Sequence, residues 1–423
     1  MVACILALII VGRRPDVLTN PQFWAEDGSV FFQDNLTVGF VAAFVTLYRG
    51  YPDLAQRLIA MAGGWMPFAW APRVYTTGAI AVTALALASF CLPAFRHIVR
   101  SEGLRLGFCV ACVCVPGGVE SFATPTNIGW ILAVWLVFLS LMQLPASAWR
   151  VAALGAGGAI AVFSTPLAVL MSPLWMLRAT AGSVRRDRND VAFAVTLLFA
   201  MCLVLAMTRT LGAEPNLVLD LPGYGKVAVG FRWISVWNGI GYTFGSVFLP
   251  PAVLSAVAPD HAWLLPVGAL VVAGAALGMA AAEGDRRLAA VLVCLYGIAG
   301  GVGLMVVGRP VMNAVLGTVM PSLYPRRYLV FPAALVVLLV LIVVDGLSAR
   351  RMRVGAVALW AVIACAWGPS FALPPLADLQ WPMWAARLEA KVASGSDTLL
   401  TIPVNGAQRI EIGAIRRRPV SGD

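Results

Sequence analysis

The chain has 423 residues, of which 60% are hydrophobic and 12% are charged, and its mean hydropathy is +0.86. Soluble domains carry roughly 25% charged residues, so this composition excludes a soluble globular protein and indicates an integral membrane protein. The net charge of +10 comes mostly from arginines scattered between apolar runs. Because these arginines form no long basic run, the charge indicates membrane orientation and anionic lipid rather than nucleic acid.

Apolar runs recur along the whole chain, and they approach the ~20 residues that a helix needs to cross ~30 Å of hydrocarbon. Alternating segments of about ten residues, which are typical of an outer-membrane barrel, are absent from the sequence. We therefore predict an all-α membrane protein with about eleven transmembrane helices. The predicted spans are 2–11, 75–93, 106–115, 128–144, 151–163, 167–177, 191–207, 263–282, 288–307, 328–345 and 354–371.

Arginine decides the predicted orientation. Short cytoplasmic loops are rich in Lys and Arg, and four short segments fit that description: 96–105, 178–188, 285–287 and 350–353. The alternation of spans then places residues 13–72 and 208–261 outside the membrane. We expect one membrane domain, 1–372, with these two outer loops, followed by a short extracytoplasmic tail, 373–423.

Patterning within the two outer loops supports two further expectations. Residues 51–62 carry apolar side chains at roughly helical spacing, with Asp53, Gln56 and Arg57 between them. That pattern predicts a helix lying along the membrane surface. Residues 208–261 hold only a marginal apolar run near 234–257, so we expect no crossing there. The outer segments also carry an excess of arginine, and we expect some of it to bind phosphate.

Two adjacent carboxylates, Glu26 and Asp27, lie between aromatic residues in the segment NPQFWAEDGSVFF, residues 20–32, soon after the first span. Charge is costly near lipid, so this pair is a candidate functional site; two solvated acids in a loop are the alternative. Like charges oppose joint ionisation and burial favours the neutral form, so the two pKa values can separate. One acid could then accept a proton from a hydroxyl group.

The sequence demands no metal and no other cofactor. It contains only two histidines, His97 and His261, which all but excludes a histidine triad or a multi-histidine metal site. Phosphate-cradling glycine loops and the His-Glu-x-x-His motif are missing. The Cys109-x-x-Cys112-x-Cys114 spacing lacks a second ligand pair, and we interpret these thiols as packing groups.

Two further polar segments lie at predicted outer helix starts. Asn127 and Trp130 offer an amide and an indole N–H to a polar ligand, although Trp130 alone is more typical of an interfacial aromatic belt. Arg326 and Arg327, next to Tyr328, could clamp a lipid phosphate with two-pronged hydrogen bonds. General contact with lipid headgroups is the alternative for these arginines.

Together these segments resemble the polytopic GT-C glycosyltransferases. The resemblance rests on an acidic pair after a short first span, an Asn-x-x-Trp segment and an Arg-Tyr pair entering a late span. It covers the architecture of the whole chain through short motifs, and the chain lacks the large soluble C-terminal domain of some members. The resemblance implies a catalytic base at Asp27 with Glu26 as its partner, a donor phosphate site at Arg327, Arg326 and Tyr328, and an acceptor pocket at Trp24, Asn127 and Trp130.

The same resemblance implies a multi-pass enzyme of the bacterial inner membrane with its active site on the periplasmic face. The donor would be a hexose or pentose on a polyprenyl phosphate, and the acceptor a lipid, a glycan or a protein. The reaction would be an inverting displacement, with the leaving phosphate stabilised by arginine. Some members use a divalent metal and others none.

Two other functions stay open: a transporter or flippase for a lipid-linked glycan, and an outer-face glycan polymerase or ligase. A transporter should place ionisable residues near the middle of several spans, often with detectable repeats. In this sequence the spans are nearly free of charge and the acids gather at their outer edge, which favours chemistry at the membrane surface.

Overall fold

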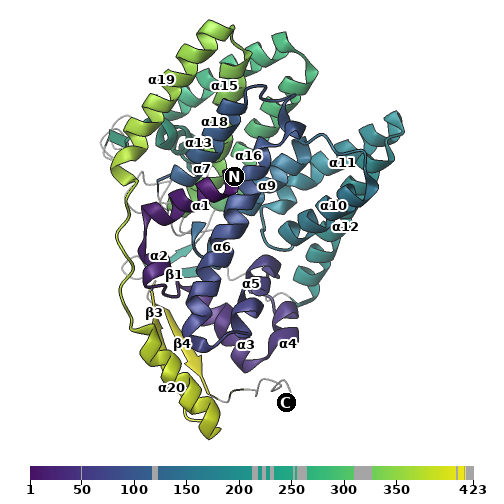
Figure 1. The fold of residues 1–423 in the computed structure, drawn as a ribbon. Helices are drawn as coiled ribbons and strands as arrows, with labels where there is room; N and C mark the ends of the chain where they lie inside the picture. The colour runs from purple at the N-terminus through teal and green to yellow at the C-terminus, as the bar shows by residue number, and fades with distance from the viewer. Residues whose placement is uncertain are drawn as a thin grey trace.

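The structure is a computed structural model that describes residues 1–48, 50–116, 122–211, 218–221, 225–228, 233–250, 253–254, 264–308, 326–405, 408–413 and 415. It describes the backbone alone at residues 211, 218–221, 225–228, 305, 307–308 and 326. Within these ranges the protein is a bundle of helices accompanied by two small two-stranded sheets (Figure 1).

The first half of the chain is helical throughout, in both long and short elements. These are α1 (Val2–Arg13), α2 (Asp16–Thr19), the π-helix η1 (Asp27–Phe32), α3 (Gln33–Thr37), α4 (Phe40–Val45), α5 (Leu54–Gly64), η2 (Phe68–Trp70), α6 (Ala71–Ala88), η3 (Ser89–Cys91), η4 (Pro93–Phe95), α7 (Glu102–Cys114), η5 (Pro125–Asn127), α9 (Gly129–Leu141), α10 (Ala148–Val162), α11 (Ala168–Arg185) and α12 (Arg188–Leu211).

The second half adds the remaining bundle helices and both sheets. Its elements are β1 (Val218–Leu221), β2 (Gly225–Ala228), α13 (Trp233–Phe248), α15 (Leu264–Glu283), α16 (Asp285–Gly308), η7 (Arg326–Leu329), α18 (Val330–Gly346), α19 (Ala349–Trp367), η8 (Gly368–Ser370), α20 (Trp381–Ser394), β3 (Leu400–Val404) and β4 (Gln408–Ile412). Each pair of strands is antiparallel.

A helix occupies each of the predicted spans. Within the described ranges six helices are long and apolar enough to cross a membrane: Phe68–Cys91, Arg188–Thr210, Leu264–Glu283, Asp285–Leu304, Arg327–Gly346 and Ala349–Ser370. Helices α1, α9 and α10 are apolar but shorter. The prediction of a helical membrane protein is confirmed in this sense, and the count of eleven crossings stays a prediction.

Helix α18 forms the centre of the bundle. Its sequence is apolar on every face, which is typical of a helix surrounded by protein, and its side chains from Val330 to Leu339 are all buried. It packs against α7, α9, α13, α15, α16 and α19. On the right of Figure 1, helix α12 packs against both α10 and α11.

Two features of the predicted outer loops were not anticipated, while their place outside the membrane stays a prediction. Helix α5 forms where a surface helix was predicted, but Gln56 and Arg57 are 1% and 2% exposed, so its polar residues face protein instead of water. Residues 208–261, where no crossing was expected, contain α13, which packs against α15, α16, α18 and α19. Its buried Asn238 and Thr243 lower its hydropathy, which explains why the run looked marginal.

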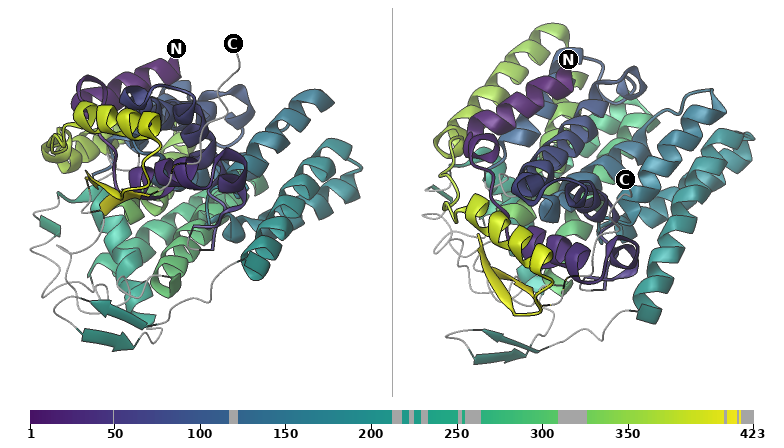
Figure 2. Two further views of the ribbon diagram at one scale, coloured as in Figure 1. Left: turned by 90° about the horizontal axis from the view of Figure 1, so that it is seen from below. Right: turned by 60° about the horizontal axis from the view of Figure 1, so that its bottom comes forward.

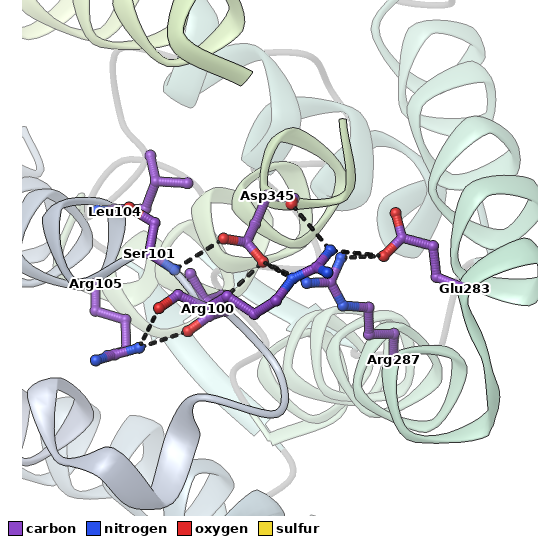
Figure 3. A network of polar contacts seen from close by, with 8 residues as sticks. Arg100, Ser101, Leu104, Arg105, Glu283, Arg287 and Asp345 are labelled. Carbon is purple, nitrogen blue, oxygen red and sulfur yellow. Dashed lines mark hydrogen bonds and ion pairs between the residues drawn. The ribbon is translucent and has the colours of Figure 1, made fainter. Parts of the chain in front are cut away.

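One end of the bundle gathers arginines and carboxylates from turns far apart in sequence (Figure 3). Asp345, at the end of α18, is 3% exposed and accepts hydrogen bonds from the backbone amides of Arg100 and Ser101, both at 2.9 Å. The Arg287 guanidinium forms ion pairs with both Asp345 and Glu283. The Asp345 cluster, defined by these five residues, therefore ties α7, α15, α16 and α18 together.

A second ion cluster belongs to the same end. Asp190 forms ion pairs with Arg178 at 2.7 Å and with Arg185 at 2.9 Å. Burial and the guanidiniums of Arg286 and Arg178 lower the pKa of His97, which belongs to the first of the predicted cytoplasmic segments. Three of the four predicted cytoplasmic segments thus meet at one end, which we call the arginine end.

The C-terminal segment returns along the N-terminal part of the chain. A linker leads from α19 to α20 down the left side of Figure 1, and the Leu373 amide donates to the Arg13 carbonyl at 3.0 Å. In α20 the Trp381 indole donates to the Phe68 carbonyl at 2.8 Å and its ring meets Phe23 edge-on. Strands β3 and β4 then lie beside the first outer segment (Figure 2). The predicted polar tail is therefore a folded unit attached to that segment.

Candidate active site

The acidic pair lies in a tight turn at the start of η1, at the end of the bundle opposite the arginine end. The Asp27 amide donates to the Trp24 carbonyl at 2.8 Å, and Ala25 has a left-handed backbone with φ +40°. Residues other than glycine rarely adopt positive φ, and such strain persists only where neighbouring contacts impose it. The π-helix that begins at Asp27 buries Phe31 and Phe32, which anchors the turn on an aromatic bed.

Asp27 is a buried carboxylate that Thr126 holds through one oxygen. It is 2% exposed, and its Oδ1 accepts hydrogen bonds from the Thr126 amide at 2.8 Å and the Thr126 hydroxyl at 2.5 Å. The Trp24 backbone also favours the ionised form of this carboxyl, through a weaker hydrogen bond. Burial raises the pKa of Asp27 from 3.8 to about 7, with a smaller push from Glu26, while the Thr126 bonds oppose the rise. A carboxylate with that pKa can accept a proton near neutral pH.

Glu26 is directed toward a different partner. Its Oε1 accepts a hydrogen bond from the Tyr48 hydroxyl at 2.9 Å, and the residue is 8% exposed. The Tyr48 ring in turn lies edge-on to Phe31, with ring centroids 6.4 Å apart. The two adjacent acids therefore differ in environment, which is the condition under which neighbouring carboxyls take different roles.

Several of the outer arginines have structural partners. Arg57 pairs with Asp34 at 3.0 Å and donates to the Thr46 carbonyl at 2.7 Å. Arg13 is 1% exposed and donates to the carbonyls of Val113 and Phe371. These groups hold the outer segments together, so they are not available for phosphate. Arg49, Arg232 and Arg309 lie outside the described residues.

Trp130 and Tyr328, from two separate candidate segments, are in contact. Their rings meet edge-on with centroids 5.0 Å apart, and the Arg327 guanidinium lies over the Tyr328 ring at 5.3 Å. Asn127 is buried, and its Nδ2 donates to Thr124 Oγ1 at 3.1 Å, so in this structure its amide supports the loop. The side chain of Arg326 lies outside the described residues.

The start of α9 connects the acid turn to the Arg327 pair. Thr126, in η5, binds Asp27, and Trp130, four residues later, contacts Tyr328. Four residues of helix correspond to roughly 6 Å along the axis. The acid and the Arg327–Tyr328 pair are therefore attached to one short stretch of backbone at the same end of the bundle.

An apolar groove lies beside this stretch. It has a volume of about 880 Å³ and is lined by residues of α11, α13 and α16, among them Leu170, Trp237, Ile240 and Leu304. Ile240 also packs against a small hydrophobic cluster that contains Tyr328, and Trp130 packs against the same cluster. The groove is thus next to the Trp130–Tyr328 contact, and its walls can accept a hydrocarbon chain.

The acid turn is covered by a part of the protein that sequence analysis did not connect with it. The Asn405 carbonyl accepts a hydrogen bond from the Ala25 amide at 2.7 Å. A side chain at Gly28 would place its Cβ 2.9 Å from Val404 Cγ2 and 3.1 Å from Ile410 Cδ1, so the hairpin presses directly on this glycine. The β3–β4 hairpin therefore belongs to the candidate site.

Two sequence signals could have pointed to the missed residues. Residues 409–412 alternate Arg, Ile, Glu and Ile, the period-two pattern of a strand with one buried face, and Ile410 and Ile412 are indeed buried. Thr126 follows Pro125 directly before a span, where a polar side chain is free to turn toward a loop. Nothing in the sequence indicates that Tyr48 would meet Glu26.

The described residues contain no group of three or more His, Cys, Asp or Glu side chains that could hold a metal ion. No protein-family model, no curated protein and no solved structure matches the chain. The geometry of the site therefore carries the functional argument.

Proposed function

We propose that the protein is a GT-C-type membrane glycosyltransferase that moves a sugar from a polyprenyl phosphate to an acceptor hydroxyl, with Asp27 as the general base. The observation that carries the proposal is the buried Asp27 carboxylate, held through one oxygen by Thr126 and with a pKa of about 7. A base is most effective when its pKa lies near the working pH. The Asp27 carboxylate is the group that would take the proton.

The remaining parts of the site fit a lipid-linked donor. The acceptor oxygen would form a bond to the anomeric carbon while the bond from that carbon to the phosphate oxygen breaks. The acceptor proton would pass to Asp27, and the polyprenyl phosphate would leave with the electron pair. Arg327 would hold the phosphate, and the 880 Å³ apolar groove beside Tyr328 would hold the hydrocarbon chain.

The orientation belongs to the same proposal. The arginine end would face the cytoplasm, because short arginine-rich turns are retained there, and the acid turn would face outside. The β3–β4 hairpin contacts the acid turn, so both must lie on the same side. A reporter enzyme that is active only in the periplasm should be active both when fused after Asp423 and when inserted near Asp27. If both fusions report the cytoplasm, the orientation is the reverse of the one proposed.

The Asp27→Asn variant tests the base. Asparagine keeps an oxygen that can accept both Thr126 bonds but cannot accept the acceptor's proton, so transfer should fall by about 10²- to 10⁴-fold. Transfer is measured with purified protein and a polyprenyl-phosphate sugar, and thermal unfolding in detergent checks the fold. Glu26→Gln is the matched control and should cost less, since Glu26 is directed to Tyr48. Full activity in both variants would remove the acid pair from the mechanism.

The Arg327→Lys variant tests the phosphate site. An ammonium cannot make the two-pronged contact of a guanidinium, so the KM for the donor should rise by about tenfold, equivalent to ~1.4 kcal/mol. Arg209→Lys is the matched control, because Arg209 is an exposed arginine near the far end of α12. An unchanged donor KM in Arg327→Lys would make Arg327 a general headgroup contact.

A transporter remains the second candidate function. The groove would suit a lipid-linked glycan in either case, but a transporter needs polar groups along its path. Among the described residues the buried charged side chains of the bundle lie near helix ends: Arg13, Arg14, Glu26, Asp27 and Arg57 at one end, and Arg105, Asp190, Arg287 and Asp345 at the other. This distribution supports surface chemistry.

A further inference from the structure

The β3–β4 hairpin follows the acid segment for most of its length. Asn405 pairs with Trp24 in an isolated parallel bridge, and its carbonyl accepts the Ala25 amide at 2.7 Å. Further along, Ser29 bonds the Gln408 side chain, and the Glu411 amide donates to Gln33 Oε1 at 2.9 Å. The contacts therefore advance together along both segments, from residue 24 to residue 33 and from 405 to 411.

The hairpin holds the most strained residue of the turn. Ala25, with φ +40°, directly precedes the acidic pair, and the Asn405 carbonyl is its hydrogen-bond acceptor. Asn405 is itself fixed, because its side chain exchanges two hydrogen bonds with the backbone of Ala377, at 3.1 and 3.2 Å. Strained backbone of this kind costs of order 1–3 kcal/mol and relaxes when its surroundings are removed.

The hairpin also supplies an apolar cover at Gly28, the residue after Asp27. Val404 and Ile410 are 5% and 0% exposed, and both would contact a Cβ at Gly28. The charged side chains of β4, Arg409 and Glu411, are exposed instead. The charged neighbour that acts on Asp27 is Glu26, and the hairpin side chains that press on the adjacent Gly28 are apolar.

We propose that the β3–β4 hairpin is a positioning element of the active site, which holds the Trp24–Asp27 turn in the conformation that delivers Asp27 to Thr126 and closes it to water. The proposal rests on the proposed transferase function for its kinetic consequences, but the placement of Asp27 is independent of that function. This proposal gives a role in the reaction to a segment that is distant from the base in sequence: Ser29 and its partner Gln408 are separated by 379 positions.

The Gly28→Ala variant tests the docking. The added methyl group must displace Val404 and Ile410, and a misplacement of about 1 Å at a reacting group can cost ~10²-fold in rate. We expect kcat to fall by about that factor while the donor KM changes less than about twofold, since the phosphate site is elsewhere. Adding Val404→Ala removes the nearest methyl group, so the double variant should recover about tenfold of the lost rate. Gly413→Ala is the matched control, because a Cβ there meets nothing within 4 Å.

A truncation after Thr398 tests the hairpin as a whole. This end point keeps the carbonyls of Ser396 and Thr398, which accept hydrogen bonds from the buried Lys391 ammonium. Without the hairpin, water reaches Asp27, so its pKa should fall from about 7 toward 3.8 and the acid limb of kcat against pH should move to lower pH. A segment that only stabilised the fold would lower the amount of active protein and leave the pH profile in place.

Carboxyl labelling gives a readout that does not depend on activity. Asp27 should be protected from a carbodiimide with glycinamide in the full chain and labelled after truncation, as measured by mass spectrometry of the peptide. Unchanged labelling together with an unmoved pH profile would overturn the proposal, whatever the loss of rate. If the full chain transfers no sugar but truncation exposes Asp27, the transferase function fails and the positioning role stands.

Discussion

The two ends of the bundle each bury a carboxylate, and the two carboxylates have opposite electrostatic surroundings. Asp345 and Asp27 are the most deeply buried acids among the described residues, at 3% and 2% exposed. Asp345 pairs with the guanidiniums of Arg287 and Arg100 and accepts two backbone amides. Asp27 has the Thr126 amide and hydroxyl as donors, and its nearest charged neighbour is another acid.

This difference separates a structural carboxylate from the proposed reactive one. Desolvation disfavours the charged form of the carboxyl at both sites. Only at the arginine end do ion pairs with oppositely charged side chains offset that cost. An acid that is fully paired with cations holds helices together and is poorly suited to proton exchange. An acid that is buried without a cation is poised to do so, which is why perturbed groups of this kind mark candidate sites.

The largest expected effect comes from breaking the Asp345 cluster. Asp345→Asn leaves Arg287 buried with only Glu283 as its acid, and removing one partner of a buried ion pair costs about 3–5 kcal/mol. Thermal unfolding in detergent, followed by tryptophan fluorescence, should show a large drop in Tm. Asp345→Asn with a wild-type Tm would show that the cluster does not tie the helices.

Asp27→Asn should raise the stability of the protein instead of lowering it, and the size of this gain should depend on pH. The folded pKa of about 7 lies above the unfolded value of 3.8, so the stability linked to this proton is complete below pH 3.8 and is lost as the pH rises through 7. At pH 8 the variant should therefore unfold at a higher temperature than the wild type. Near pH 4 the two should coincide.

A smaller effect is expected at Thr126. Its hydroxyl bond favours the ionised form of Asp27, so Thr126→Val should raise the pKa further and move the acid limb of transfer to higher pH by about one unit. The Thr126 backbone amide remains as a donor, which limits the shift. A limb that moves to lower pH would contradict this account of the site.

The smallest effect is expected at an exposed ion pair of the arginine end. Arg96 and Glu102 form an ion pair with side chains 59% and 70% exposed. Such pairs contribute about 0–1 kcal/mol, so Arg96→Gln should change Tm by no more than a degree or two. A drop comparable to that of Asp345→Asn would mean that the whole arginine end acts as one network.

The long apolar helices were predictable from the sequence, since apolar runs reflect local composition, whereas several of their ends lie three to eight residues from the predicted ones. The tertiary partners were not. The burial of Gln56 and Arg57 was not predicted, because a helical pattern does not show that polar residues can be buried with Asp34 and Ser164 as partners. The run in α13 looked marginal because buried polar residues lower hydropathy without ending a helix.

For the candidate site, the sequence supplied the acids and their aromatic setting but not their environments. The raised pKa of Asp27 depends on burial and on Thr126, which lies 99 residues away. The contact of Trp130 with Tyr328 joined two segments that had been singled out separately. The contribution of the hairpin could not be predicted, because docking between distant segments leaves no periodic signal in either of them.

The distance along the chain between the acid turn and its hairpin sets an order of events during synthesis. Ser29 and its partner Gln408 are separated by 379 positions, and ribosomes add about 5–20 residues per second. Roughly 20 to 75 seconds must therefore pass between the two segments leaving the ribosome. Through that interval the nascent bundle holds an incomplete acid turn, so a prematurely terminated chain would be inserted in the membrane without the contacts that complete the proposed site.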